Sequence, residues 1–353
     1  MEVNSNRDFL FLFDVVMSNA NGDPDQENKP RMDYETNTML VSDARRKRDV
    51  RDFIKTKGYP IFVDTLADNK VSMETMFDAV VGSFLRDKEK VNGLLSQNAV
   101  LHELAKAAEL PLDKLEQYIQ NRKDVLKNSK KKAELIKFNN VLLTAIIRES
   151  LIDIRWFGSA MAVEGVSRTY TGPIQLAWGY SLHPVELVQS STISSIMNED
   201  NSTFGKKYKV YYALTAHYGT VSKRNAEKTG MTDADLTLFR KALVQGLMSN
   251  QTDSKQGQSP LLYLEVAYTP EFDGYLGDLR RFIKVDYEEA RPIRKLADLQ
   301  VDFGSLNNVL EKISGKYEKV LLWKHPALAQ ESFKNLPVQV EVLDLLESIP
   351  DHA

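Results

Sequence analysis

The chain has 353 residues, of which 42% are hydrophobic and 27% are charged, and this composition is typical of a soluble globular protein. Its formal net charge is −3, which counts mildly against a nucleic-acid binder but does not exclude one, because the local field in a groove matters more than the sum. It has no cysteine, no signal-peptide pattern at residues 1–5 and no apolar run near the ~20 residues of a membrane span, so disulfides and thiolate zinc sites are excluded and a cytoplasmic location away from membranes is expected.

The N-terminal segment predicts a strand, a turn-rich loop and a basic helix. Residues 9–16 form a continuous apolar run typical of a buried strand, and residues 19–24 are rich in Asn, Gly, Asp and Pro. Ser42 or Asp43 can cap the helix that follows. At about 100° per residue, its basic side chains share one face: Lys47, Arg48, Arg51 and Lys55.

The opposite face of this helix carries apolar residues and the stem of Arg46, which is therefore expected to point toward the core. Asp49 and Asp52 are the nearby acids, and both are expected away from the basic face. Like charges four residues apart cost helix stability, and that cost is understandable if a polyanion lies along the face. The pattern favours nucleic-acid contact slightly over a solvated surface helix.

Helical spacing replaces strand patterns over residues 60–155, with the longest helix expected from about 129 to 154. A second basic region at 122–132 is interpreted as a solvated face. Strands are expected again at 156–163, 173–182, 208–214 and 261–268, with a polar arm at 189–203 and a helix at 232–248 capped by Thr232. Without the helical insertion and the arm, a βαββαβ skeleton remains, which is the ferredoxin-like or RRM-like arrangement.

Motifs for catalysis are scarce. The five histidines lack metal-ligand spacing, and no nucleotide-binding or hydrolase motif occurs, so no catalytic residue, metal or cofactor is predicted. His183, before a proline at a strand end, could stack on a base, although a structural role is favoured. The acidic side chains of the 19–35 loop could hold Mg²⁺ or Ca²⁺, but turn building by their local hydrogen bonds is the preferred interpretation.

Several ordered motifs resemble one family. They are residues 19–24 (NANGDP), 29–33 (KPRMD), 41–51 (VSDARRKRDVR), 153–158 (DIRWFG), 171–175 (TGPIQ), 181–186 (SLHPVE), 204–206 (FGK) and 254–260 (SKQGQSP). Together they resemble the Cas-seven (Cas7) family, the backbone subunits of type I CRISPR Cascade complexes. The late motif, with residues 262–264 (LYL), looks most like the type I-B branch, with type I-C next. The resemblance spans residues 9 to about 285.

The resemblance implies an α+β fold with a ferredoxin-like or RRM-like palm at 1–59 and 155–290. It also implies helical fingers at 60–154, a protruding β-hairpin thumb at 186–207 and a C-terminal extension at 291–353 packed on the palm. Such subunits are non-catalytic scaffolds that line up in several copies along one CRISPR RNA, whose guide pairs with target DNA in antiviral defence. The implied partners are CRISPR RNA, target DNA, further copies of the chain, a Cas-five-type cap, and large and small subunits.

The residues expected to contact RNA come from the basic helix, the end of the 173–182 strand, the base of the thumb and a late polar loop. They are Ser42, Arg45, Lys47, Arg48, Arg51, His183, Phe204, Lys206, Lys207, Lys255, Gln256 and Gln258. Two other functions stay open. One is a metal-dependent endoribonuclease of the type III backbone kind, which would use Asp23 or Asp33. The other is a metabolite-binding α+β protein, which would be a monomer without RNA affinity.

Overall fold

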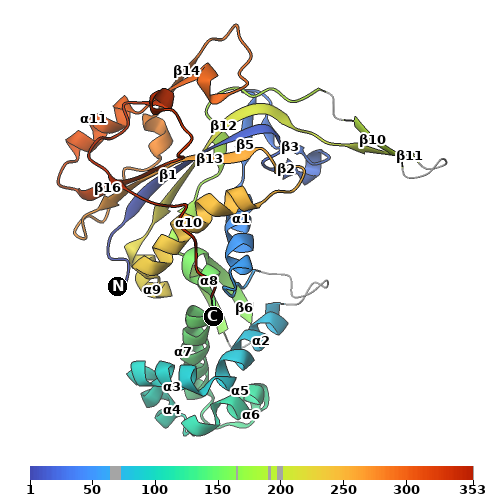
Figure 1. Ribbon diagram of the computed structural model, residues 1–353. Coiled ribbons are helices and arrows are strands. Elements are labelled where there is room, and N and C mark those ends of the chain that lie inside the picture. The colour runs from blue at the N-terminus through green and yellow to red at the C-terminus, as the bar shows by residue number, and fades with distance from the viewer. Residues whose placement is uncertain (64–72, 164–165, 190–191, 197–201, 353) are drawn as a thin grey trace. The chain divides into compact units, whose positions relative to one another are not determined.

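The computed structural model describes residues 1–63, 73–163, 166–189, 192–196 and 202–352 (Figure 1). The protein divides into two compact units. The first consists of Met1–Lys57, Ile174–Arg224 and Thr232–Ala353, and the second of Gly58–Pro173 and Asn225–Met231. Both units contain helices and strands, so the expected mixed α+β class is confirmed.

The first unit is built around a sheet in which the described residues form nine strands. Their order is β18-β16-β13-β1-β12-β9-β5-β4, and β8 also pairs with β12. The central strand β1 (Arg7–Ser18) lies antiparallel between β12 (Val210–Val221) and β13 (Gln258–Tyr268). The others are β4 (Met32–Asp33), β5 (Thr38–Val41), β8 (Ile174–Leu176), β9 (Gly179–Ser181), β16 (Tyr317–Lys324) and β18 (Glu341–Val342).

Two helices cover one face of this sheet, α1 (Asp43–Thr56) and α10 (Asp233–Ser249). The ring of Phe9 on β1 meets that of Phe239 on α10 edge-on, with centroids 5.8 Å apart. The helices approach closely at Gly246, where an added Cβ would lie 3.0 Å from the Asp49 carbonyl oxygen. The Thr232 hydroxyl caps α10, as the sequence predicts.

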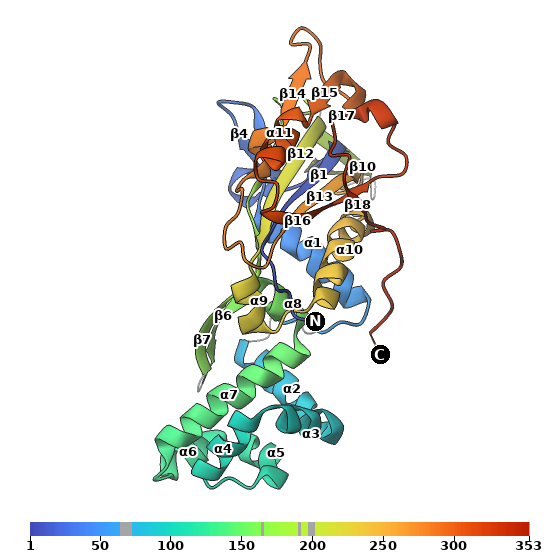
Figure 2. The ribbon, with the colours of Figure 1, turned by 90° about the vertical axis from the view of Figure 1, so that its left-hand side faces the viewer.

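The C-terminal part of the first unit covers the opposite face (Figure 2). Leu10 and Leu12, which alternate with the phenylalanines of β1, pack there in one cluster with Val301 and Phe303. Because both faces of β1 are covered, the strand reads as a continuous apolar run. The covering elements are η3 (Leu279–Phe282), β14 (Lys284–Tyr287), η4 (Leu296–Asp298), β15 (Leu299–Asp302), α11 (Gly304–Lys312), η5 (Gln330–Ser332) and β17 (Phe333–Lys334).

Two small hairpins extend from the same unit. The 19–35 loop contains β2 (Gly22–Asp23), the 3-10 turn η1 (Pro24–Gln26) and β3 (Lys29–Pro30). The polar segment at 189–203 contains β10 (Thr192–Ile196), which pairs antiparallel with β11 (Ser202–Lys206). The structure therefore forms a hairpin where the sequence predicts an exposed hairpin or arm.

The second unit is mostly helical. Its core surrounds the helix α7 (Lys132–Ser150), whose buried side chains include Phe138 and Leu142. The core also contains Phe77, Leu101 and Ile119 from neighbouring helices. The helices are α2 (Met73–Arg86), α3 (Lys88–Gln97), α4 (Ala99–Ala107), η2 (Leu112–Lys114), α5 (Leu115–Gln120), α6 (Arg122–Asn128), α7 (Lys132–Ser150) and α8 (Ile152–Phe157). The chain returns to this unit at Asn225–Met231, which includes most of α9 (Lys223–Thr229). Among the described residues, no helix has the length and apolar character needed to span a membrane.

Two sequence expectations in this unit were wrong. The single helix expected at 129–154 is interrupted at Leu151, which has extended backbone angles and separates α7 from α8. The strand expected at 156–163 begins only at Gly158, whose φ of +71° ends the helix, since Trp156 and Phe157 belong to α8. That strand, β6 (Gly158–Val163), pairs with β7 (Val166–Thr171) in a separate hairpin and not with the large sheet.

The second basic region also differs in part from a solvated face. Arg122 is buried and forms an ion pair with Asp78, with 2.8 Å between the nitrogen and the carboxylate oxygen. Its guanidinium lies 6.0 Å from the centre of the Phe77 ring. Arg122 is thus part of the packing of the helical unit.

Candidate nucleic-acid interface

The start of α1 is fixed to the turn-rich loop before it. The Ser42 hydroxyl accepts a hydrogen bond from the Arg45 backbone N–H at 3.2 Å and so caps the helix. The Ser42 N–H and hydroxyl both donate to the side-chain oxygen of Asn21, at 2.8 and 2.9 Å. The motifs at 19–24 and 41–51 therefore form one local structure, and the hydrogen bonds of Ser42 connect them.

Carboxylates balance more of the positive charge on the basic face of α1 than the helical wheel predicts. Lys47 lies 2.9 Å from Asp43, and Arg48 forms an ion pair with Asp52. The expectation that Asp52 lies away from the basic face was wrong, because a side chain four residues along a helix is a direct neighbour. These pairs reduce the positive field that the face presents.

Arg46 points inward, as the wheel predicts, and its side chain is 0% exposed. Its guanidinium lies 2.9 Å from the Asp49 carboxylate and 4.5 Å from the centre of the Phe13 ring. Burial lowers the pKa of Arg46 to about 10, against the opposing effect of Asp49. Arg46 therefore anchors α1 to the sheet and lies outside any surface site.

A groove of about 570 Å³ in the first unit brings together residues that are far apart in the sequence. Its walls are the first turn of α1 with the loop before it, the segment that follows the β10–β11 hairpin, and the loop after α10. Among the described lining residues, five side chains are cationic and two are carboxylates. The cations are Arg45, Lys206, Lys207, Lys209 and Lys255, and the carboxylates are Glu27 and Asp253.

Both carboxylates of the groove are in contact with its hydrogen-bond donors. The Tyr208 hydroxyl donates to Glu27 at 2.8 Å, and the Lys206 ammonium lies 3.8 Å from the same carboxylate. Lys207 lies 2.8 Å from Asp253. The hydrogen bond from Tyr208, followed by the charge of Lys206, lowers the pKa of Glu27, and Lys207 does the same for Asp253.

Lys255 is held by backbone carbonyls. Its ammonium donates to the oxygens of Asn19 at 2.6 Å and Ala20 at 3.1 Å. Burial, with a further contribution from the charge of Arg45, lowers the pKa of Lys255 to about 8. The loop around it is fastened to the end of β1, because the Val16 N–H donates to the Gly257 carbonyl at 2.8 Å. Lys255 thus adds charge to the groove and also ties two of its walls together.

Two residues from the sequence-based set are not supported as surface contacts. His183 is buried, and its Nε2 accepts a hydrogen bond from the Leu214 N–H at 3.0 Å. Its Nδ1 lies 2.8 Å from the Pro184 oxygen, so the imidazole is part of the protein interior. Gln258 is also buried, and its amide donates to the Lys255 carbonyl at 3.2 Å. Both were selected from motifs in which the buried and the exposed positions look alike.

The remaining members of the set are spread over the unit. Gln256 is exposed in the loop after α10, and Arg51 is half-buried on α1. Phe204 lies in β11, where its backbone is paired with that of Ser194. Sequence reasoning missed Tyr208 and Lys209 as groove residues, although the run 206–209 (KKYK) carries a recognisable basic signal.

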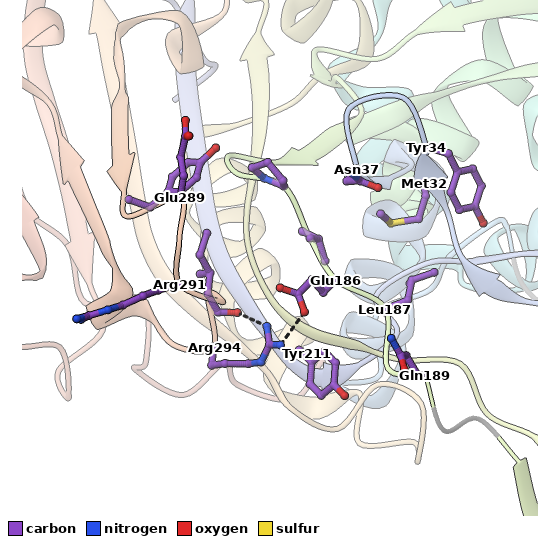
Figure 3. A pocket seen from close by; sticks show the side chains of 14 residues that line it. Met32, Tyr34, Asn37, Glu186, Leu187, Gln189, Tyr211, Glu289, Arg291 and Arg294 are labelled. Atoms are coloured by element: carbon purple, nitrogen blue, oxygen red, sulfur yellow. Dashed lines mark hydrogen bonds and ion pairs between the residues drawn. The ribbon is translucent and has the colours of Figure 1, made fainter.

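A second hollow of about 870 Å³, drawn in Figure 3, is less suited to a polyanion. Its described lining includes the cations Arg291 and Arg294 and the carboxylates Glu186 and Glu289, so its charges balance. Arg294 forms an ion pair with Glu186 at 2.7 Å and lies 4.1 Å from the centre of the Tyr211 ring. The groove beside α1 is therefore the better candidate for a phosphate backbone.

Asp23 and Asp33 of the 19–35 loop build turns, as preferred from the sequence, whereas Glu27 pairs with the groove residues Tyr208 and Lys206. Asp23 accepts from the Asp25 N–H at 3.2 Å and from Arg31 at 3.3 Å. Asp33 accepts from the Glu35 N–H at 3.0 Å and from the Thr36 hydroxyl at 2.7 Å. Within the described part of the chain, no group of three or more His, Asp or Glu side chains is arranged to hold a metal ion.

A mixed sheet protein with a cation-lined groove of this kind has the features of a protein that binds a phosphate backbone. The chain belongs to the Cas7 family, since the family model described as "CRISPR-associated protein Cas7" matches residues 5–304. A curated relative, "CRISPR-associated protein Cas7" of Haloferax volcanii, is 24% identical over 335 residues, which cover 88% of this chain and 84% of the relative.

The fold is similar to that of chains in solved structures. One belongs to a structure titled "CRISPR RNA-guided surveillance complex, pre-nicking", with a TM-score of 0.54, 14% identity and 96% coverage of both chains. Another, from a "CRISPR RNA-guided surveillance complex", has a TM-score of 0.47 and 12% identity, with 96% of this chain and 95% of that chain covered. The first likeness supports the mixed α+β architecture described above.

Proposed function

We propose that this protein is a non-catalytic backbone subunit of a CRISPR RNA-guided surveillance complex and that its groove beside α1 binds the phosphates of CRISPR RNA. The observation that carries the proposal is the convergence of five cations from three separate segments in one groove of a Cas7-family chain. Contacts to phosphate give affinity and position without reading sequence, as a subunit that binds any guide requires.

The finer parts of the proposal follow the family resemblance. The part of the large sheet formed by β13-β1-β12-β9 is the palm, because β1-α1-β9-β12-α10-β13 has the βαββαβ order and these four strands are adjacent in space. The β10–β11 hairpin belongs to the thumb at 186–207, residues 60–154 of the mostly helical second unit supply the fingers, and residues 291–353 are an extension on the palm. The closing motifs favour a type I-B system, with type I-C next.

Assembly on the guide completes the role. Several copies line up along one CRISPR RNA, together with a Cas-five-type cap and the large and small subunits, and the guide pairs with target DNA. In addition to the groove, Lys47, Arg48 and Arg51 on the outer face of α1 are kept as candidate RNA contacts, and so are Ser42, Phe204 and Gln256. His183 and Gln258 are left out because both are buried.

The groove is tested by charge reversal. Lys206→Glu/Lys207→Glu is compared with Lys284→Glu/Lys319→Glu, in which two lysines of similar exposure, each paired with a carboxylate, are reversed away from the groove. Binding to fluorescein-labelled CRISPR RNA is measured by anisotropy at several salt concentrations. We expect the first variant to lose at least tenfold in affinity and to show a shallower salt dependence, by about 0.7 in log–log slope per lost phosphate contact. Equal affinities for the two variants would refute the assignment.

The ribonuclease alternative is separated from the scaffold by one assay. Wild-type protein and Asp23→Asn/Asp33→Asn are incubated with labelled RNA and Mg²⁺. The scaffold predicts intact RNA in both reactions. Cleavage by the wild type that the double variant loses would instead establish the ribonuclease.

A further inference from the structure

The two carboxylates of the groove lie where RNA phosphates are expected. Glu27 follows η1 in the turn of the β2–β3 hairpin, and Asp253 lies in the loop after α10. Their side chains are 64% and 61% exposed, so burial does not explain their pairing with cations. Each carboxylate instead provides a lysine at the base of the β10–β11 hairpin with a counter-charge from the protein itself.

These contacts link three parts of the groove. Glu27 connects the 19–35 loop to Lys206 and Tyr208, and Asp253 connects the loop after α10 to Lys207. Because exposed ion pairs in water are weak, a phosphate can displace either carboxylate at small cost. A ligand that supplies several phosphates at once can displace both, whereas a single phosphate gains little over the resident carboxylate.

We propose that Glu27 and Asp253 are internal competitors that occupy Lys206 and Lys207 in the free protein and limit how tightly the groove holds RNA. This inference rests on the proposed function, since it assumes that the same groove binds the guide. Its consequence is selectivity for long RNA. A short or partial contact does not outweigh the carboxylates, but a phosphate backbone that runs the length of the groove does.

The test removes the charge and keeps the shape. Glu27→Gln retains an oxygen that can accept from the Tyr208 hydroxyl, and Asp253→Asn retains one for Lys207. With fluorescein-labelled CRISPR RNA, we expect each variant to bind about 1.5- to 5-fold more tightly than wild type, the range that exposed ion pairs give. The double variant is expected to bind more tightly than either, with a log–log salt slope steeper by up to about 0.7 per released lysine.

The matched control is Glu341→Gln, which removes an exposed carboxylate outside the groove; the Lys319 ammonium lies 2.8 Å from it. The RNA affinity of this variant is expected to equal that of the wild type. Thermal melting of each variant checks the fold. Unchanged or weaker RNA binding by the Glu27/Asp253 double variant, while Lys206→Glu/Lys207→Glu loses RNA, would overturn the competitor role alone. Wild-type affinity in the lysine variant would overturn both the competitor role and the groove.

Discussion

Asp49 is the carboxylate that holds the basic helix in place, and its replacement by alanine is expected to destabilise the protein strongly. It is 4% exposed, accepts from Arg46 at 2.9 Å and from Asn250 at 2.6 Å, and forms an ion pair with Arg45. Asp49→Ala leaves the fully buried Arg46 guanidinium without its counter-charge. Breaking a buried pair by removing one partner costs about 3–5 kcal/mol of the free energy of unfolding.

Urea denaturation followed by circular dichroism measures this cost. The control is Asp52→Ala, which removes a half-exposed partner of Arg48 from the same helix and is expected to cost less than about 1 kcal/mol. Arg46→Met/Asp49→Ala is expected to recover much of the loss, since no unpaired charge then remains buried. If Asp49→Ala costs no more than Asp52→Ala, or if the double variant is no better than the single one, the reasoning is wrong.

Three further predictions concern the walls of the groove and the helix behind it. Gly257→Ala places a Cβ 2.2 Å from the Val16 carbonyl oxygen at a φ of +99°, so it is expected to cost about 1–3 kcal/mol in urea denaturation and to weaken RNA binding; wild-type stability would contradict this. The pKa of Lys255 is about 8 in the folded state, below that of an ordinary lysine, so the folded protein loses this proton at a lower pH than the unfolded chain does. Relative to Lys255→Met, wild-type stability should therefore rise, and its RNA affinity should fall, as the pH is raised through about 8; parallel pH profiles would refute the shift. Thr232→Ala removes the hydroxyl that accepts from the Asp235 N–H at 3.2 Å and should lower the melting temperature, at a cost of about 1 kcal/mol, whereas an unchanged temperature would count against the cap.

Elements with strong local patterns were predictable from the sequence. The apolar run of β1 and the capped start of α10 lie where their spacing and cap residues place them. The structure of the 156–163 segment was not predictable from the sequence, because a short apolar run fits a buried helix end as well as a strand. Packing decides between the two, since Trp156 is fully buried in α8 and Gly158, with a φ of +71°, then ends the helix.

The candidate site was predictable only in its parts. Arg45, Lys206 and Lys255 could each be selected from a motif, but spacing cannot show that residues some 200 positions apart line one groove. The family resemblance implies a shared role for these residues but does not predict their contacts. Whether Lys255 faces solvent or backbone carbonyls depends on how its loop docks on β1, a long-range interaction that no local pattern encodes.

Copurification with RNA tests the central claim most directly. The full chain is expressed together with a candidate CRISPR RNA and analysed by size exclusion in low salt and in about 0.5 M salt, with Lys206→Glu/Lys207→Glu in parallel. The account predicts an RNA-bound oligomer whose stability falls with salt and which the Lys206/Lys207 variant does not form. A monomer free of nucleic acid at low salt, or an RNA-bound oligomer that the Lys206/Lys207 variant retains in full, would contradict it.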